Sequence, residues 1–486
     1  MVRNLCFQVF FALLVLLWPM TGKAAVCGDF FCHLVDANRA SLIMLRETRL
    51  IEPELAAALA AALADLDDAQ ERTSNYLDLE ADLISAVGEE ASRIHLGRSR
   101  QDLHGTVRRM MMRRAVLELL EAQVAVRDSF LTVAQKHATT VIPAYTHGVQ
   151  AQPTTLGHLL LAYEAAMSRT AMRMQQTYAR LNTSPLGAAA LTTSGFPIDR
   201  RRLAQLLGFA APVENSFDAN LVSSLDYKTE LAGVLMSEAT QIGQFSQTLH
   251  VHYADPQPWI ELERALTSGS SIMPQKANPR PLDRLRASAN EVLGAGEQVF
   301  LNAHNTIAGM NEYRPIETIL RASRNTLDMY VRYGQIVSNL VVHPERALDA
   351  LNRGFSTMTE VADLLVRREG LPFRVAHRYA ARLTRIARDG NTRASSLSDR
   401  QLVATFTEVV GRAPVISVAE VRAAMDPVRM VSARAGLGGP QPEEFSRMRR
   451  AARKALERDA QWVRTESARL VAVRQNLRQQ LTPPSR

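Results

Sequence analysis

The chain has 486 residues, of which 22% are charged, 47% hydrophobic and 6% aromatic. This composition excludes an intrinsically disordered or collagen-like protein. Lys and Arg number 57 against 49 Asp and Glu, a formal charge of +8, so the position of the excess charge has to distinguish among nucleic acid, an anionic membrane and an anionic substrate as partners.

The first 25 residues are typical of a secretory signal peptide. They contain Arg3 and Lys23 but no acid, and residues 5–18 form an apolar run with one polar interruption. Small residues follow, which favours cleavage near Ala24 and a periplasmic or secreted protein without stable membrane association. The alternative is a protein anchored in the membrane by an uncleaved signal, for which the apolar run is short.

Two cysteines, Cys27 and Cys32, remain once this segment is removed. In an oxidising compartment they form either one small-loop disulfide or two free thiols. Two thiols without His partners at ligand spacing make a poor zinc site, and no phosphate loop or Rossmann glycine pattern occurs. We therefore predict no metal and no cofactor.

Long helices dominate the body of the chain. Apolar residues recur at helical spacing over segments well beyond the usual 11–12 residues. One of 27 residues would be roughly 40 Å long at 1.5 Å per residue. Rods of this length fit a helix bundle better than a sheet. The predicted helices cover residues 106–136, 155–181, 227–251, 284–302 and 316–340.

Three polar breaks separate these helices, at residues 94–102, 143–153 and 267–279. Each has an ordinary explanation, because Ser-rich turns cap helices and a lone His is usually structural. Together they supply Arg, Lys, Ser, Thr, Asn and Gln donors around one His. Such a set suits a small molecule that carries carboxylates and undergoes an acid–base step.

The C-terminal segment carries the other part of the basic excess. Residues 441–486 hold 11 basic and 5 acidic residues, so residues 26–440 are close to neutral. Apolar residues recur at helical spacing in this tail, which predicts a solvated amphipathic helix. No zinc-finger spacing or RNA-binding strand motif supports nucleic acid as a partner.

The third polar break resembles the signature loop of the fumarase/aspartase superfamily. From residue 269 to 279 it runs Gly-Ser-Ser-Ile-Met-Pro-Gln-Lys-Ala-Asn-Pro, a long and specific match. Further stretches narrow the resemblance to argininosuccinate lyase and extend it over most of residues 36–440. They are residues 95–102, 145–153, 184–188, 196–200, 215–218, 354–357 and 371–374.

This resemblance implies an all-α, three-domain subunit, an elongated bundle of long helices, and a homotetramer with a central helical bundle. Each active site would be shared by three subunits. After the signal peptide at 1–25 we expect an N-terminal helical domain at 26–104, a central long-helix domain at 105–353 and a small C-terminal helical domain with the basic tail at 354–486. The implied reaction is anti β-elimination of fumarate from an N-substituted aspartate, with argininosuccinate as the family default and another amine possible.

The matched positions imply individual roles. Ser270 matches the serine that removes the proton next to the departing carboxylate, and a serine needs surrounding donors or cations that favour its alkoxide. His147 matches the acid or acid-supporting histidine, and Asp283 stands where the family has the Glu that partners it. The substrate-binding positions, which would hold a small dicarboxylate-containing substrate, are Ser99, Arg100, Gln101, Thr146, Gln152, Lys276 and Asn278.

Several positions depart from the family pattern. Gln101 replaces Asn, Asp283 replaces Glu with one methylene less, and the segment 310–318, which helps hold the arginine end in the family, keeps only Asn311. Smaller departures occur at Tyr76, Leu103, Val149, Gln150 and Ala277. They leave a second hypothesis open, a catalytically silent ligand-binding or structural protein that keeps the lyase fold.

Overall fold

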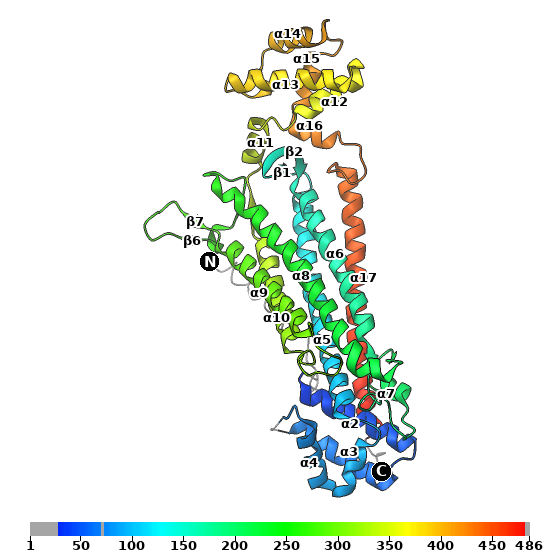
Figure 1. The fold of residues 1–486 in the computed structure, drawn as a ribbon. Coiled ribbons are helices and arrows are strands. Elements are labelled where there is room, and N and C mark those ends of the chain that lie inside the picture. The colour runs from blue at the N-terminus through cyan, green and yellow to red at the C-terminus, as the bar shows by residue number, and fades with distance from the viewer. Residues whose placement is uncertain (1–27, 70–71, 482–486) are drawn as a thin grey trace. The chain divides into compact units, whose positions relative to one another are not determined.

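The computed structural model describes residues 28–69 and 72–481. The predicted signal peptide and Cys27 lie outside these residues. Cys32 is disulfide-bonded, and its pairing with Cys27 stays a prediction. The described chain is overwhelmingly helical, so the predicted all-α fold class is confirmed. Its elements, labelled in Figure 1, fall into two compact units.

The first unit contains the described parts of Met1–Met111 and Ala468–Arg486, together with Asn182–Asn220. Its Leu- and Ala-rich helices bury one continuous apolar core that includes Leu34, Leu42 and Leu59. Side chains cap several of these helices, and the Asp29 carboxylate accepts the Cys32 N–H at 2.8 Å where the first of them begins. The elements are α2 (Phe30–Glu47), α3 (Pro53–Asp65), α4 (Tyr76–Val87), the 3₁₀-helices η1 (Leu66–Asp68) and η2 (Glu89–His95), α7 (Arg200–Leu206), the start of α5 (Arg100–Lys136) and the end of α17 (Pro442–Gln479).

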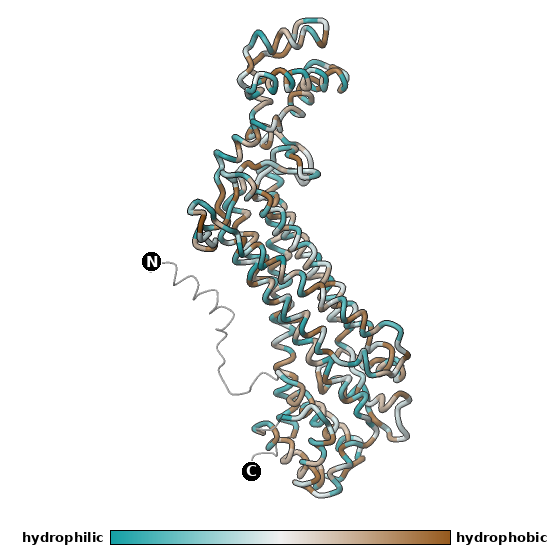
Figure 2. The backbone as a smooth tube through the Cα atoms, turned by 60° about the vertical axis from the view of Figure 1, so that its left-hand side comes forward, coloured by the Kyte–Doolittle hydropathy of each residue, from teal (hydrophilic) through white to brown (hydrophobic). Residues whose placement is uncertain are grey.

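The second unit, Met112–Leu181 and Leu221–Ser467, contains a bundle of long helices. In Figure 1, α8, α9 and α10 run side by side, and α6 packs on α8. Figure 2 shows hydrophilic and hydrophobic residues alternating along these helices, as expected for rods that bury one stripe each. Their bounds confirm the predicted spans within a few residues: α6 (Leu156–Leu181), α8 (Ser223–His250), α9 (Arg280–Ala303) and α10 (Glu317–Ser338).

The interior of this bundle combines aromatic rings with buried charges. Phe130, Phe245 and Tyr333 make mutual ring contacts at 4.9–5.6 Å between centroids. Arg127, which is fully buried, donates to Glu164 at 2.8 Å and to Asp459 at 2.7 Å. Removing one partner of such a group would leave a buried charge uncompensated, so these contacts constrain how the helices pack.

A smaller group of helices follows the bundle in the second unit and has its own apolar core, which includes Val361, Tyr379 and Phe406. Contacts of α11 with β1 (Val141–Thr146) and of α16 with β2 (Val149–Thr155) join this group to the hairpin that these two strands form. Its elements are α11 (Pro344–Arg353), α12 (Met358–Glu369), α13 (Phe373–Asp389), η6 (Ala394–Ser396), α14 (Asp399–Val410), α15 (Val418–Ala424) and α16 (Pro427–Ser432).

Strands occur only as two-stranded pairs among the described residues. β1 (Val141–Thr146) pairs with β2 (Val149–Thr155), β5 (Ile260–Leu262) with β8 (Leu340–Val342), and β6 (Ser268–Gly269) with β7 (Ala277–Asn278), all antiparallel. In the first unit, β3 (Thr183–Ser184) runs parallel to β4 (Ala211–Pro212). The remaining short helices are η3 (Asp218–Val222), η4 (Val251–Ala254) and η5 (Arg264–Leu266).

The basic C-terminal segment is helical, as predicted, but it is not simply a solvated tail. Within the second unit Arg453 pairs with Asp128, and within the first unit Arg474 donates to Asp36 at 2.8 Å. At least these two arginines therefore have acidic partners from earlier in the chain. No described helix combines the length and the apolar character that a membrane-crossing helix needs.

Candidate active site

The predicted site residues fall into two sets. Ser99, Arg100 and Gln101 belong to the first unit, and the other seven belong to the second. No group of three or more His, Cys, Asp or Glu side chains in the described chain is placed to hold a metal ion. The first set offers a hydroxyl, an amide and a guanidinium, and the second adds imidazole, carboxylate and ammonium side chains to its hydroxyls and amides.

In the first unit, Ser99 caps α5. Its hydroxyl oxygen accepts the Gln101 N–H at 3.2 Å, and its own N–H donates to Asp102 at 2.8 Å. The Gln101 amide donates to the Asn220 carbonyl at 3.4 Å. Arg100 is exposed at the helix start and has no hydrogen-bond or ionic partner among the described residues. An exposed guanidinium beside a helix N-terminus is well placed to meet a carboxylate.

Asp102 holds this turn to the loop after α6. Its side chain is fully buried, and its second oxygen accepts the N–H groups of Gly187 at 2.8 Å and Ala189 at 3.0 Å. Burial raises the pKa of Asp102 to about 6 against the lowering effect of its N–H donors. Sequence reasoning did not single out this residue. The sequence signal that could have identified Asp102 is its position: it directly follows three predicted substrate ligands in a motif that precedes a long helix.

Arg98 belongs to the same polar break as Arg100 but has a different environment. It is buried, and its guanidinium donates to Ser41 at 2.7 Å and to Asn38. It also donates to the His95 ring at 3.1 Å. Since these acceptors occupy its N–H groups, Arg98 organises the turn instead of binding an exposed anion.

In the second unit, His147 sits at the tip of the β1–β2 hairpin. His147 and Gly148 have φ values of 54° and 73°, as a type I′ two-residue turn requires. Thr146 and His147 are exposed, and the nearby Gln152 donates to the Thr359 hydroxyl at 3.1 Å. The turn therefore presents the imidazole and the Thr146 hydroxyl at the surface of the unit.

An aromatic contact ties this hairpin to the segment that leads to the serine loop. The Tyr145 ring lies 5.3 Å from the His252 ring, which lies 4.6 Å from Trp259 just before β5. Burial lowers the pKa of His252 to about 4, so this ring is neutral at physiological pH. These residues also line a broad groove of the second unit. His252 and Trp259 were not predicted, because aromatic residues at this spacing carry no local motif.

Ser270 begins an exposed loop between β6 and β7 that projects from the body of the unit (Figure 1). Its hydroxyl oxygen accepts the backbone N–H of Met273 at 3.2 Å and of Ile272 at 3.4 Å. Hydrogen bonds to the charged form of a group favour that form, so these donors favour an alkoxide at Ser270. Ile272 is 82% exposed, which leaves the loop free to be covered by substrate or another chain.

The end of the same loop carries Lys276 and Asn278. Lys276 is exposed, and its ammonium has no hydrogen-bond or ionic partner in the described chain. The Asn278 amide donates to the carbonyls of Ser268 at 3.1 Å and Gly269 at 3.4 Å, which closes the base of the loop. Ser270 and Asn278 are therefore brought together, and Lys276 remains available for an anion.

Asp283, in the first turn of α9, has other partners than the predicted histidine. Its carboxylate accepts from Arg286 at 2.7 Å and lies 3.5 Å from His250. Arg286 also contacts the His250 ring at 2.7 Å. The described structure gives Asp283 no contact with His147, so the expected pairing of these two residues is not formed within the chain.

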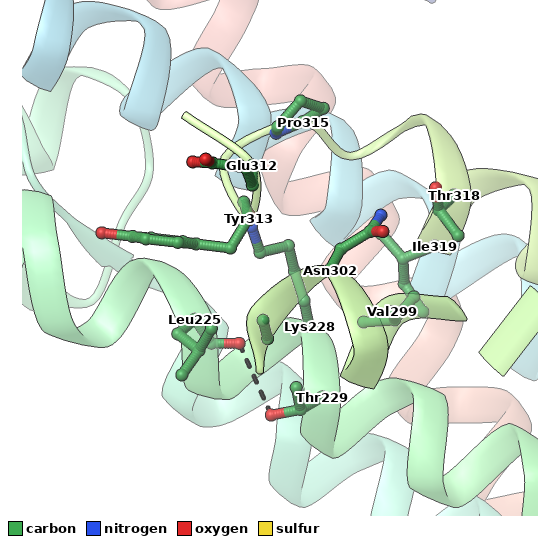
Figure 3. A pocket seen from close by; sticks show the side chains of 11 residues that line it. Leu225, Lys228, Thr229, Val299, Asn302, Glu312, Tyr313, Pro315, Thr318 and Ile319 are labelled. Carbon is green, nitrogen blue, oxygen red and sulfur yellow. Dashed lines mark hydrogen bonds between the residues drawn. The ribbon is translucent and has the colours of Figure 1, made fainter. Parts of the chain in front are cut away.

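The segment 310–318 lines a small pocket between α8 and the end of α9 (Figure 3). Lys228 is buried there, and its ammonium donates to the Tyr313 carbonyl. The Tyr313 hydroxyl accepts the Gly309 N–H at 2.6 Å. Glu312 is exposed at the pocket. The loop is thus fixed from within, and Glu312 supplies the negative charge that could meet a cationic group.

Comparison with known proteins identifies the family. Residues 56–294 match the lyase family, and residues 355–432 match the argininosuccinate lyase C-terminal family. Argininosuccinate lyase from Methanoculleus marisnigri is 36% identical over 480 residues, covering 92% of this chain and 94% of that protein. Argininosuccinate lyase 2 from Agrobacterium fabrum is 33% identical, covering 85% of this chain and 84% of that protein.

Solved structures agree. An EDDS lyase in complex with formate matches with a TM-score of 0.85 and 28% identity, covering 93% of this chain and 91% of that one. A class II fumarase from Schistosoma mansoni, at 15% identity and a TM-score of 0.64 over 82% of this chain and 89% of that one, shares the fold. The chain therefore belongs to the argininosuccinate lyase family of the fumarase/aspartase superfamily and is a carbon–nitrogen lyase.

Proposed function

We propose that the protein cleaves an N-substituted aspartate by anti β-elimination and releases fumarate. Ser270 removes the proton, and exposed cations such as Lys276 and Arg100 hold the carboxylates. The observation that carries this proposal is the pair of backbone N–H groups directed at the Ser270 oxygen inside the signature loop. These donors favour the alkoxide of Ser270 over its neutral hydroxyl, and the alkoxide is the form that can accept the substrate proton.

Two candidates are proposed for the amine half of the substrate. One is arginine, the family default, and the other is a different amine. The exposed Glu312 carboxylate beside the pocket in Figure 3 supports a cationic amine. The departures along residues 310–318 and the likeness to an EDDS lyase support a substrate other than argininosuccinate. In either case the aspartate half is bound by the same hydroxyl, amide and cationic groups.

The assembly is proposed to be a homotetramer with each site shared by three subunits. Large exposed apolar side chains in two of the three predicted site loops, Val149 at 68% and Ile272 at 82% exposure, support a covering partner. Asp283 and His147, which lack contact within one chain, would then meet across subunits. Light scattering on the purified protein measures the mass, and a monomer would contradict this part of the proposal.

Export is proposed from residues 1–25, and sequencing the mature N-terminus tests it.

A screen in the addition direction tests the substrate. Fumarate is incubated with arginine, other amino acids and diamines, and mass spectrometry detects N-substituted aspartates. The expected result is one preferred amine whose adduct forms with wild-type protein and is also cleaved back to fumarate. Failure to form or cleave any adduct, with the protein folded, would contradict the proposed reaction.

A further inference from the structure

His95 occupies a built environment in the first unit that the proposed mechanism does not yet use. It is the last residue of η2, four residues before Ser99. Its Nδ1 accepts a hydrogen bond from the Arg98 Nε–H at 3.1 Å. Its ring stacks on Tyr76, with centroids 4.5 Å apart and an interplanar angle of 21°. Arg98 and Tyr76 are both buried, so two contacts fix the orientation of the imidazole.

The contact with Arg98 also fixes the proton on the ring. A guanidinium only donates hydrogen bonds, so Nδ1 must present its lone pair, and the single ring proton lies on Nε2. A proton on Nδ1 would break this bond, and a ring protonated on both nitrogens would also place two cations together. Burial, together with the charges of Arg98 and Arg100, lowers the pKa of His95 to about 4. The ring therefore stays neutral at physiological pH.

The supports of the ring are themselves supported. Arg98 lies over the Tyr76 ring, 5.1 Å from its centroid, and is held by Asn38 and Ser41 from α2. The Tyr76 hydroxyl donates to Glu80 at 3.0 Å. By contrast, Nε2 of the half-buried His95 has no hydrogen-bond partner among the described residues and is not enclosed. One edge of the ring is thus locked, and the other presents a free N–H.

We propose that His95 is a fixed, neutral hydrogen-bond donor to a substrate carboxylate, with Arg98 and Tyr76 as its positioning residues. The proposal rests on the proposed function, because Ser99 and Arg100 of the same turn are the expected carboxylate binders. A neutral imidazole N–H donates a hydrogen bond without giving up its proton at neutral pH. His95 therefore binds and orients the carboxylate, and proton transfer belongs to other groups.

Two amide variants test the position of the donor. In His95→Gln the side-chain amide N–H reaches the place of Nε2, whereas the shorter His95→Asn reaches only the place of Nδ1. Calorimetric titration with succinate measures binding, kinetics with the preferred substrate give KM and kcat, and thermal unfolding checks the fold. His95→Asn should weaken succinate binding and raise KM by roughly 10- to 100-fold, while His95→Gln should keep most of both. A purely structural role would lower the unfolding midpoint in both variants and leave succinate affinity unchanged.

A second pair tests positioning without altering His95. Tyr76→Phe keeps the stacked ring and should bind succinate like the wild type, whereas Tyr76→Leu removes the stack and should raise KM several-fold more than kcat changes. Equal succinate affinity in His95→Gln and His95→Asn, or in both Tyr76 variants, would overturn the inference. If the succinate affinities of the wild type and the variants rank as expected but the wild type cleaves no N-substituted aspartate, the proposed function alone is refuted. Active wild type with unaffected His95→Asn would refute this inference alone.

Discussion

The substitution Asp102→Asn should loosen the loop that Asp102 holds, without a change in size. The two carboxylate oxygens accept three backbone N–H groups, from Ser99 on one side and from Gly187 and Ala189 on the other. An amide offers one oxygen, so its NH₂ must face at least one of these N–H groups in either orientation. Leaving a buried donor unpaired costs about 1–3 kcal/mol. At about 1.4 kcal/mol per factor of ten, the local opening equilibrium should rise roughly 10- to 100-fold.

Hydrogen exchange followed by mass spectrometry measures this opening. Peptides covering residues 184–189 should exchange about 10- to 100-fold faster in Asp102→Asn than in the wild type. The matched control is Asp82→Asn, an exposed carboxylate of α4 in the same unit, which should exchange like the wild type. Unchanged exchange in residues 184–189 of Asp102→Asn would refute the assignment of these three hydrogen bonds to loop stability.

Two further predictions concern the second unit. Burial raises the pKa of Glu238 from 4.5 to about 7, so folding takes up a proton, and this group lowers stability as pH rises from about 4.5 through 7, by up to about 3 kcal/mol. The denaturant midpoints measured at pH 5 and at pH 8 should therefore differ less in Glu238→Gln than in the wild type. The exposed control Glu121→Gln should keep the wild-type difference between the two pH values. The same difference in Glu238→Gln as in the wild type would show that Glu238 does not cause the pH dependence. Gly148→Ala adds a Cβ into open space, but the residue has a φ of 73°, and a side chain at such a φ costs about 1–2 kcal/mol. The substitution should therefore lower both the unfolding midpoint and kcat. Gly195→Ala, equally open but without a positive φ, should change neither.

The long helices could be predicted because their signal is local and repeated. The spans expected at 155–181 and 284–302 correspond to Leu156–Leu181 and Arg280–Ala303. The β1–β2 hairpin was missed, and there the sequence is ambiguous. Pro143 lies inside β1, where a proline argues against a strand, and the register is irregular between Pro143 and Tyr145.

The partners of individual side chains were beyond the reach of local pattern. Arg98 meets Asn38 and Ser41, which lie about 60 residues earlier, so its buried role depends on how α2 packs. Asp283 meets His250, a residue that no motif distinguished from other histidines. By contrast, the signature loop could be recognised whole, because the short β6–β7 pair and the turn between them depend on contiguous residues.

The proposed role of Ser270 as the base is tested most directly by the rate of fumarate release by Ser270→Ala with the preferred N-substituted aspartate. The increase in fumarate absorbance gives kcat, and succinate titration shows whether the carboxylate site is intact. Ser432→Ala, an exposed serine whose hydroxyl donates to the Val428 carbonyl of its own helix turn, is the matched control. Ser270→Ala should lower kcat roughly 10²- to 10⁴-fold, with succinate binding kept and the control unchanged. Fumarate release by Ser270→Ala at the wild-type rate would contradict the proposed role of Ser270.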